Sequence, residues 1–196
     1  MTSPDLAPDT RERLIAAARE VICDVGLKRA RMEDIAAVAG VSRAAVYYHF
    51  HSKGELAAAI VDDVFLRLTD TIRGALADGP LDGIIAATVR FFADQVAVAR
   101  LLIAEMEAPP DPKRLLAQHR DRLVGIIRRR VSTDMAAGRV RPMDPDVAAQ
   151  AIAGLLRVAP MEMICNESAD LDHLTIQLTD FLRHALGAAP VSGHRQ

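Results

Sequence analysis

The sequence predicts an all-α fold of about nine helices, and three observations support this. Apolar residues recur every three or four positions through most of the chain, as on a helix face that is turned toward a core. No segment shows the alternation of apolar and polar residues that marks a β-strand. Glycine and proline divide the chain into pieces of helical length. With 196 residues, 51% of them hydrophobic, the chain can form one large or two small domains.

The N-terminal region begins with a short arm and one helix. Residues 1–8 contain two prolines and are expected to form a loose arm. A helix follows from Asp9 or Thr10, with Glu12 placed to complete a capping box, and it ends at Gly26. The apolar stripe of this helix consists of Leu14, Ile15, Ala18, Val21, Ile22 and Val25.

Two short helices joined by a tight turn come next. The first is expected over about 32–39, and Gly40 supplies the turn. Ser42 is a good N-cap for the second helix. Val46 and Phe50 face the core of this small unit, so the polar residues between them point away from it. This order of elements indicates a helix-turn-helix motif, in which the second helix enters the DNA major groove.

Turn and cap signals place the remaining helices. A second capping box over 52–55 opens a long helix that ends before Gly79. The strongest break is the proline-rich run 109–112, and another is framed by Pro142 and Pro145. The further helices are expected over about 81–97, a short segment that ends by 107, 113–137, 145–158 with an irregular continuation toward 164, and 171–186.

A DNA-binding surface on this chain must be local, because the net charge is −2. Between Gly26 and Lys53 five basic residues accompany two acidic ones, Glu33 and Asp34. Over residues 1–55 basic and acidic residues are equal in number, so the positive strip is narrow. A few well-placed cations are sufficient, since each phosphate contact releases counterions.

The helix after Ser42 carries side chains that suit DNA recognition. Arg43 can offer two donors to guanine O6 and N7, and the small side chains of Ala44 and Ala45 let the helix sit deep in the groove. Donors for phosphate oxygens are provided by Tyr47, Tyr48, His49 and Lys53. The expected DNA-binding residues are Arg31, Ser42, Arg43, Ala44, Ala45, Tyr47, Tyr48, His49 and Lys53. The alternative is that the two tyrosines only pack against the protein and that the arginine is only solvated. The turn glycine and both helix caps favour DNA binding over this alternative.

The segment from about Thr10 to Ile60 resembles the N-terminal domain of TetR-family transcriptional regulators. The shared features are Gly26, the runs 34–36, 39–42 and 46–50, and Lys53 before Leu56. The resemblance covers about a quarter of the chain. It implies a homodimer of nine-helix subunits with a variable C-terminal ligand domain. It also implies phosphate contacts from Tyr47, His49 and Lys53, and contacts to bases or nearby backbone from Arg43, Ala44, Ala45 and Tyr48.

Two places depart from the pattern of this family. Its members often have Thr or Ser where Ala30 and Arg31 stand, and Thr or Gly where Ala45 stands. A side-chain cap for the helix that begins at about Met32 is therefore missing. Arg31 is expected to replace the usual phosphate contact with a charge.

The C-terminal half is interpreted from its apolar pattern. The helix over 171–186 has more apolar residues than one face needs, and the helix that begins at Pro145 carries small residues. We expect these helices to form a four-helix dimer interface, because helix-turn-helix proteins normally read two half-sites with two subunits. Packing within one chain is the alternative. The expected interface residues are Ala148, Ala151, Leu155, Leu174, Leu178 and Phe181.

An apolar pocket for a small molecule is expected among the helices between 81 and 137, with the molecule bound between these helices and the long helix that ends before Gly79. His119 falls at helical spacing between Leu116 and Leu123, so we expect it to face inward and to contact the ligand. The alternative is an ordinary histidine of the core or of the surface without a ligand. The run 128–130, three arginines, is most simply a solvated face, and the alternative is a contact to an acidic effector or a second contact to DNA. The expected pocket residues are Phe91, Phe92, Gln95, Met106, His119, Leu123 and Ile127.

Several other functions are disfavoured. The chain has no nucleophile elbow, no phosphate-binding glycine loop and no zinc-ligand spacing, so no catalytic residue, cofactor or metal is expected. Cys23 and Cys165 are expected to be reduced core thiols, with a redox role as the less favoured alternative. No signal peptide is apparent, and no apolar run reaches the roughly 18 residues of a membrane span, which predicts a cytoplasmic protein.

We therefore expect a helix-turn-helix DNA-binding domain over 1–55, a ligand-binding and dimerisation domain over 56–190 and a flexible tail over 191–196. The expected function is that of a homodimeric transcriptional repressor, released from a palindromic operator by a small apolar or amphipathic effector. The alternatives are an activator or a regulator without a natural ligand and, more remotely, an all-α enzyme or lipid-binding module. No membrane partner is expected.

Overall fold

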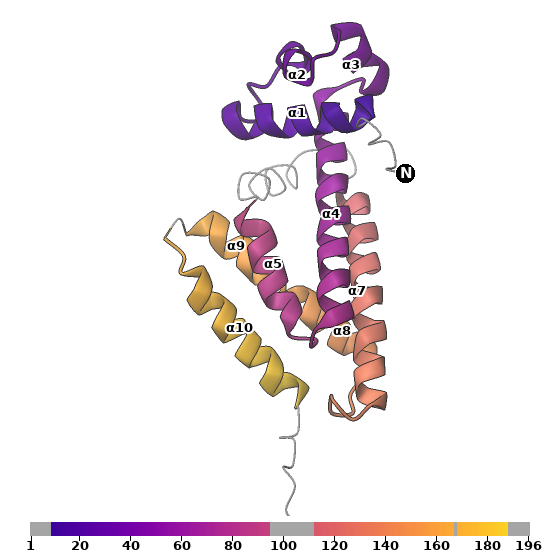
Figure 1. The fold of residues 1–196 in the computed structure, drawn as a ribbon, viewed down its shortest axis with the longest axis vertical. Helices are drawn as coiled ribbons and strands as arrows, with labels where there is room; N and C mark the ends of the chain where they lie inside the picture. Colours follow the sequence, from indigo (N-terminus) through magenta and orange to yellow (C-terminus); the bar gives the residue numbers. More distant parts are fainter. Residues whose placement is uncertain (1–8, 95–111, 167, 188–196) are drawn as a thin grey trace, which may run out of the picture. The chain divides into compact units, whose positions relative to one another are not determined.

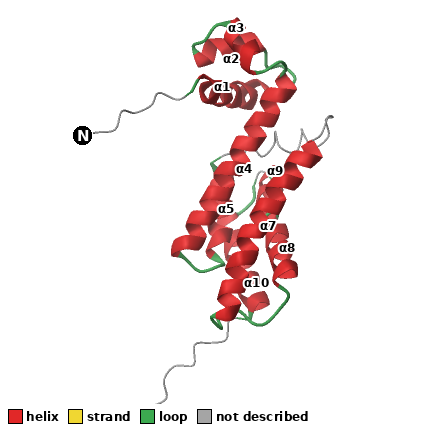
Figure 2. Ribbon diagram, turned by 90° about the vertical axis from the view of Figure 1, so that its right-hand side faces the viewer, coloured by secondary structure: helices red, strands yellow, loops and turns green. Residues whose placement is uncertain are grey.

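The computed structural model describes residues 9–94, 112–166 and 168–187 (Figure 1). Within these ranges the backbone forms helices joined by turns and contains no strand, as the sequence predicts (Figure 2). The described residues fall into two compact units that divide after Val64. The functional boundary expected after residue 55 stays a prediction.

The helices of the described chain, in order, are α1 (Thr10–Val25), α2 (Met32–Ala39), α3 (Arg43–His49), α4 (Lys53–Asp78), α5 (Gly83–Ala93), α7 (Pro112–Ala136), α8 (Pro145–Leu155), α9 (Val158–Cys165) and α10 (Leu171–Leu186). The unit boundary lies within α4, so this single helix supplies residues to both units.

The first unit has a small core in which α1 packs against α2 and α2 packs against α3 (Figure 1). The helical spacing of the apolar residues makes this possible, because each helix turns one stripe inward. The side chains of Leu14, Ile35, Val46, Phe50 and Leu56 are almost completely buried. Val25, expected in the stripe of α1, is instead 36% exposed at the end of that helix.

Arginine and glycine together close the C-terminal end of α2. Arg13 of α1 donates from one guanidinium nitrogen to the carbonyl oxygens of Ala39 at 2.5 Å and Gly40 at 3.4 Å. A cation is favourable there, because the last carbonyls of a helix lack backbone partners. Gly40 has a φ of 64°, a left-handed conformation that glycine adopts without steric cost. The turn between α2 and α3 is thus fixed at its start.

Three N-terminal caps in this unit can be compared with the sequence. The hydroxyl of Ser42 accepts a hydrogen bond from the backbone N–H of Ala45 at 3.1 Å, which confirms the predicted cap of α3. Arg31 precedes α2 and provides no side-chain cap, also as predicted. The predicted capping box of α1 is wrong, because the carboxylate of Asp9 accepts no hydrogen bond from the first turn.

The second unit is built around α5, which packs against α9 and α10 (Figure 1). The predicted helix over 81–97 is shorter at its start, since α5 begins at Gly83, and the expected helix that ends by 107 lies outside the described residues. The predicted irregular continuation past 158 is a separate helix, α9. Pro160 lies in its first turn, where a backbone N–H has no helical partner to lose.

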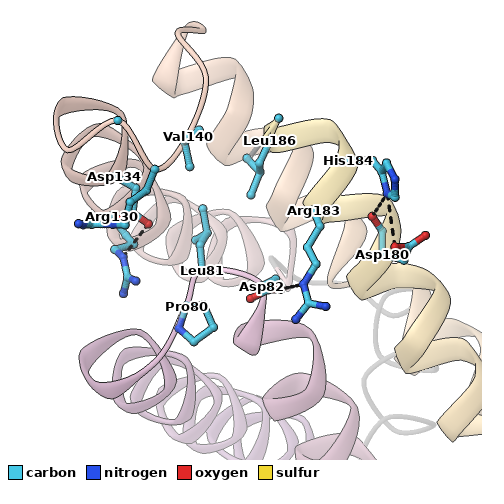
Figure 3. A pocket seen from close by; sticks show the side chains of 13 residues that line it. Pro80, Leu81, Asp82, Arg130, Asp134, Val140, Asp180, Arg183, His184 and Leu186 are labelled. Carbon is cyan, nitrogen blue, oxygen red and sulfur yellow. Dashed lines mark hydrogen bonds and ion pairs between the residues drawn. The ribbon is translucent and has the colours of Figure 1, made fainter. Parts of the chain in front are cut away.

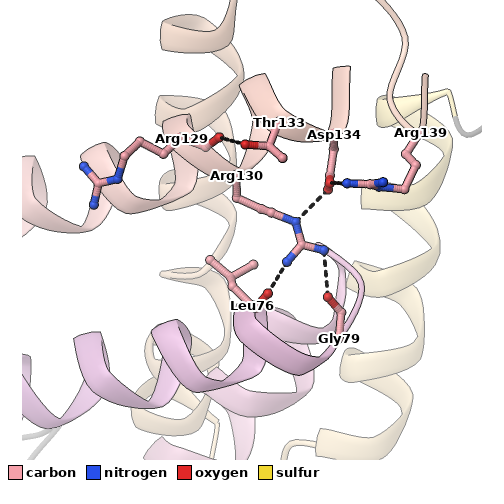
Figure 4. Close-up of polar contacts among 7 residues, drawn as sticks. All are labelled: Leu76, Gly79, Arg129, Arg130, Thr133, Asp134 and Arg139. Carbon is pink, nitrogen blue, oxygen red and sulfur yellow. Dashed lines mark hydrogen bonds and ion pairs between the residues drawn. The ribbon is translucent and has the colours of Figure 1, made fainter. Parts of the chain in front are cut away.

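Arg130 of α7 ties this helix to the end of α4 within the second unit (Figure 4). Its guanidinium donates to the carbonyl oxygen of Leu76, to that of Gly79 at 2.7 Å and to the carboxylate of Asp134 at 2.9 Å. Asp134 is 2% exposed and also accepts from Arg139 at 2.6 Å. The expectation of a solvated arginine run is therefore wrong at Arg130, because three protein acceptors replace water around it.

Both cysteines, Cys23 and Cys165, are free and exposed, so the expectation of core thiols is wrong. They occupy positions near the C-terminal ends of α1 and α9 that lie outside the buried stripes. Partial burial raises the pKa of the Cys23 thiol, and the nearby charge of Arg19 opposes that rise.

One stretch of the described chain, Pro145–Cys165, is long and apolar enough to cross a membrane by length and composition alone. From the sequence we expect no membrane span, because no uninterrupted apolar run is long enough, and this finding differs from that expectation. The stretch is divided into α8 and α9, and 39% of its most apolar window is buried in the protein. A core helix passes the same test, so the finding is weak evidence for a membrane span.

We predict that Arg130→Met lowers the free energy of unfolding by about 2–4 kcal/mol. The substitution leaves two carbonyl oxygens and part of the buried Asp134 carboxylate without donors. Chemical denaturation followed by circular dichroism measures this loss. The matched control is Arg129→Met, since Arg129 is exposed on the same helix and its loss should cost under about 0.5 kcal/mol. Equal losses in the two variants would show that the Arg130 contacts do not stabilise the fold.

Candidate nucleic-acid interface

Helix α3 presents four side chains to solvent from one face. Arg43, Ala44, Tyr47 and Tyr48 have the spacing i, i+1, i+4 and i+5, so they cover a continuous arc of about 140° that is centred away from the buried Val46. All four are exposed, and Tyr48 reaches 82% exposure. The structure thereby brings together on one side of this helix four of the nine residues that the sequence proposed for DNA recognition.

The other expected residues lie at the edges of this face. Ala45 and His49 are half-buried, and the ring of His49 meets that of Tyr48 edge-on with centroids 5.2 Å apart. Ser42 is exposed while its hydroxyl caps the helix. Arg31 is exposed at the start of α2.

Lys53 makes contacts that sequence reasoning missed. Its ammonium group donates to the carbonyl oxygens of Leu27 at 3.1 Å and Lys28 at 3.2 Å, in the loop after α1. A lysine ammonium has three N–H donors, so one donor remains for a phosphate oxygen. Lys53 therefore fixes the start of α4 against this loop and keeps the capacity to bind an anion.

Reciprocal hydrogen bonds close the first turn of α4. The backbone N–H of Glu55 donates to the hydroxyl of Ser52 at 3.1 Å, as a capping box requires. The carboxylate of Glu55 accepts from the backbone N–H of His51 at 2.8 Å, one residue earlier than the capping box predicts. The hydrogen bond from the His51 backbone lowers the pKa of Glu55. The turn that carries Lys53 thus also holds an ionised carboxylate at neutral pH.

Arg43, the residue best suited to read a guanine, has two partners in the unbound protein. One of its terminal nitrogens lies 3.0 Å from a carboxylate oxygen of Glu33 on α2. Its guanidinium carbon lies 5.5 Å from the centroid of the Tyr47 ring. Sequence reasoning counted Glu33 only as a negative charge, because its neighbourhood with Arg43 depends on how α2 and α3 pack.

The expected ligand pocket is only partly covered by the described residues, and Gln95 and Met106 lie outside them. Phe92, His119 and Ile127 are buried, while Phe91 and Leu123 are half-buried. The ring of His119, 3% exposed, stacks on the ring of Phe65 with centroids 4.9 Å apart and an interplanar angle of 12°. Sequence reasoning missed Phe65, which places α4 in contact with the expected pocket residues.

A different groove of about 830 Å³, lined by charged as well as apolar side chains, opens in the second unit (Figure 3). It is lined by the turn between α4 and α5 and by the ends of α7 and α10. Many of its charged side chains pair with one another: Arg183 with Asp82, Arg130 with Asp134, and His184 with Asp180. None of the expected pocket residues lines it. The apolar ligand pocket therefore stays a prediction.

The residues expected at a dimer interface differ in exposure. Ala148 is buried, whereas Leu155, Leu174 and Leu178 are half-buried, and Ala151 and Phe181 are exposed. Phe181 is 63% exposed on α10, and Val147 is 64% exposed on α8. The two helices thus leave apolar surface uncovered by the described part of the chain.

Among the described residues, no group of three or more histidine, cysteine, aspartate or glutamate residues could hold a metal ion.

Comparison with known families gives two matches along the chain. The family of bacterial regulatory proteins of the tetR type matches residues 14–60. The C-terminal domain of AefR-like transcriptional repressors matches residues 81–175. The two matches together span most of the chain and follow the order of the two compact units.

Curated relatives match this chain over limited stretches. The HTH-type regulator TtgR of Pseudomonas putida is 41% identical over 58 residues, which are 30% of this chain and 28% of the relative. The probable HTH-type regulator ArpR, also of Pseudomonas putida, is 36% identical over 76 residues, 39% of this chain and 36% of the relative. This chain therefore aligns with about a third of the length of these relatives.

Solved structures match over nearly the whole chain. FadR from Bacillus subtilis, in complex with stearoyl-CoA, has a TM-score of 0.73 at 18% identity, covering 94% of this chain and 99% of that chain. SmeT, the repressor of the SmeDEF multidrug efflux pump of Stenotrophomonas maltophilia, has a TM-score of 0.69 at 24% identity, covering 96% of each chain. At these identities the likeness shows a shared fold.

Proposed function

The chain belongs to the TetR family of transcriptional regulators, and we propose that it acts as a homodimeric repressor of a palindromic DNA operator. We further propose that a small apolar or amphipathic effector releases it from that operator, and that it works in the cytoplasm. The observation that carries DNA binding is the exposed face of α3, where Arg43, Tyr47 and Tyr48 stand together away from the core.

The chemistry of this face divides into two roles. Arg43 can place two donors on guanine O6 and N7, which is the usual arginine contact in the major groove. Tyr47, His49 and Lys53 can donate to phosphate oxygens and so set the register of the helix on the duplex. Ala44 is small and exposed, which lets the backbone approach the bases. Arg31 adds a cation where α2 begins.

The dimer proposal rests on uncovered apolar surface. On α8, the exposed residues Val147 and Ala151 lie four positions apart and therefore share one face. On α10, Leu174, Leu178 and Phe181 form another. Two copies of this pair of faces can bury each other in a two-fold bundle, as isologous interfaces do. Two subunits then read half-sites spaced by about one turn of DNA, roughly 34 Å, or a multiple of it.

The effector proposal rests on the aromatic surroundings of His119. This histidine is buried in the second unit against Phe65, and its imidazole can exchange hydrogen bonds with a polar head group. The stearoyl-CoA bound to FadR and the drug efflux regulated by SmeT favour an apolar ligand for a pocket in this fold.

Helix α4 offers a route from effector to operator. It carries Lys53 in its first turn and Phe65 later along the same helix. A ligand that displaces Phe65 therefore acts on the helix whose first turn Lys53 fixes to the loop after α1. Release requires only that the effector bind the DNA-incompetent state more tightly than the DNA-bound state.

A role as an activator is the alternative, and one relative of this chain is named as an activator. The HTH-type activator FasR of Mycolicibacterium smegmatis is 41% identical to this chain over 68 residues, 31% of that relative. The sign of regulation depends on where the operator lies relative to the promoter, and the repressor named in the C-terminal family match favours repression. The catalytic and lipid-carrier alternatives predict no DNA affinity, which sets them apart experimentally.

We predict that replacing Arg43 and Tyr47 with alanine abolishes operator binding without disturbing the dimer. Both side chains are exposed on α3 and contribute to the proposed interface rather than the core. A mobility-shift assay with a duplex selected by the wild-type protein measures binding, and sedimentation measures the dimer. Replacing Arg129 with alanine removes an exposed cation from the second unit and should leave binding unchanged. Full binding by the double variant would refute the interface.

We predict that Phe181→Glu converts the dimer to monomer and Ile176→Glu does not. Both residues are 63% exposed on α10. Their five-residue separation places them about 140° apart around the helix, so only Phe181 lies on the proposed interface. Analytical ultracentrifugation over a range of concentrations measures the change. Dissociation by both variants, or by Ile176→Glu alone, would place the interface elsewhere.

We predict that apolar compounds stabilise the protein and weaken its binding to the selected duplex. Suitable probes are dodecanoic acid, dodecylamine and biphenyl, which differ in the charge of the head group. Thermal unfolding detects binding, and His119→Ala should reduce the response because it removes the stack on Phe65. His173→Ala on α10 is the control, since His173 is exposed. A protein that responds to none of the probes would contradict effector control by apolar ligands.

A further inference from the structure

We infer that Glu33 is a specificity-determining residue that positions Arg43 for guanine and lowers binding to other sequences. This inference rests on the proposed DNA-binding function and adds to it a residue that does not itself contact a base. The observation behind it is the ion pair of these two side chains, with nitrogen and oxygen 3.0 Å apart, on the exposed side of the first unit.

The guanidinium of Arg43 is constrained from two sides. Glu33 holds one terminal nitrogen, and the ring of Tyr47 lies 5.5 Å from the guanidinium carbon. An arginine has five N–H donors in a planar fork, so one edge remains for guanine after Glu33 has taken another. Long side chains lose rotamer freedom on binding, and a side chain that is already oriented loses less. Glu33 can therefore favour the one orientation that reads a base.

The ion pair is a poor device for stabilising the fold. The side chain of Arg43 is 67% exposed and that of Glu33 is 47% exposed, so water and salt screen their attraction. The folding of α2 and α3 depends instead on buried residues such as Ile35 and Val46. A negative charge beside the recognition helix also opposes DNA, whose phosphates repel it. A contribution to discrimination between sequences accounts for both the position of this charge and its partner.

Two effects on DNA binding follow from this geometry. On a non-cognate duplex Arg43 finds no guanine to engage its free edge, and the carboxylate remains close to the phosphates as a penalty. On the cognate duplex guanine O6 and N7 engage the free edge of the guanidinium while Glu33 keeps the other edge. The negative charge of Glu33 thus weakens binding to every duplex, and it weakens binding to the cognate duplex least. The ratio of specific to non-specific affinity rises as a result.

The test compares two duplexes and a set of variants in the full-length chain. One duplex is selected by the wild-type protein from a random library, and the other is a scrambled duplex of the same length and composition. We expect Glu33→Gln to tighten binding to the scrambled duplex and to lower the affinity ratio about fivefold or more. Repeating the selection with this variant should weaken the guanine preference at the same base pair that Arg43→Ala affects.

Two further variants separate positioning from charge. Asp34→Asn removes the same charge from the same turn of α2 and should tighten binding to both duplexes equally, leaving the ratio unchanged. Glu33→Asp keeps the charge and shortens the reach, so it should lower the guanine preference without tightening binding to the scrambled duplex. Circular dichroism melts should show a similar small loss of stability for Glu33→Gln and Asp34→Asn, because each removes one carboxylate from the first turn of α2, where a negative charge is favourable, and Glu33→Asp keeps that charge.

The inference is overturned if Glu33→Gln behaves like Asp34→Asn, or if it changes the affinity ratio equally in the wild-type and Arg43→Ala backgrounds. In both cases Glu33 acts through its charge alone. If the wild-type protein selects no sequence from the library, the proposed function itself fails, and this inference fails with it. Wild-type selection followed by an unchanged ratio in Glu33→Gln overturns the inference and leaves the proposed function standing.

Discussion

The burial of Val46 and Phe50 is the interaction on which the function of this chain depends. These two side chains, at most 1% exposed, fix which face of α3 turns toward the core. Because an α-helix repeats every 3.6 residues, the residues around Arg43 and Tyr47 then have only the solvent side available. The left-handed turn at Gly40 and the cap from Ser42 set where the helix begins. A DNA-reading surface thus arises from a small hydrophobic core.

The proposed DNA-binding surface has few positive charges, and contacts within the protein hold several of them in place. The whole chain has a net charge of −2, and several cations of the first unit already have partners within the protein. Lys53 binds two loop carbonyls, Arg13 binds the end of α2, and Arg43 binds Glu33. These contacts hold the cations in place before DNA arrives, which reduces the entropy lost on binding. A weakly charged chain can in this way bind a polyanion at a defined site.

Sequence reasoning located most of the local features, with the capping box of α1 as an exception, and missed the contacts between helices. The cap at Ser42, the turn at Gly40 and the absent cap at Arg31 could be predicted, because each depends on residues within one or two turns. The pairing of Glu33 with Arg43 and the stack of His119 on Phe65 depend on how separate helices pack. The partners of each pair lie on separate helices, so the number of residues between them in the sequence does not indicate that they meet.

The same limit explains two wrong predictions in the second unit. Arg130 was placed on a solvated face because its neighbours are arginines, yet three acceptors from α4, its following turn and α7 surround it. Cys165 was placed in the core from its apolar neighbours, yet it is exposed at the end of α9. Composition near a residue indicates its average environment, whereas its position around the helix decides its burial.

Hydroxyl-radical footprinting of the full-length protein on a selected duplex tests the central claim most directly, because it reports where the recognition helices sit. Two α3 helices in one dimer predict two protected patches on the same face of the DNA, related by a two-fold axis and separated by about 34 Å or a multiple of that distance. A single protected patch, or protection spread evenly along the duplex, would contradict the account of a dimer that reads two half-sites.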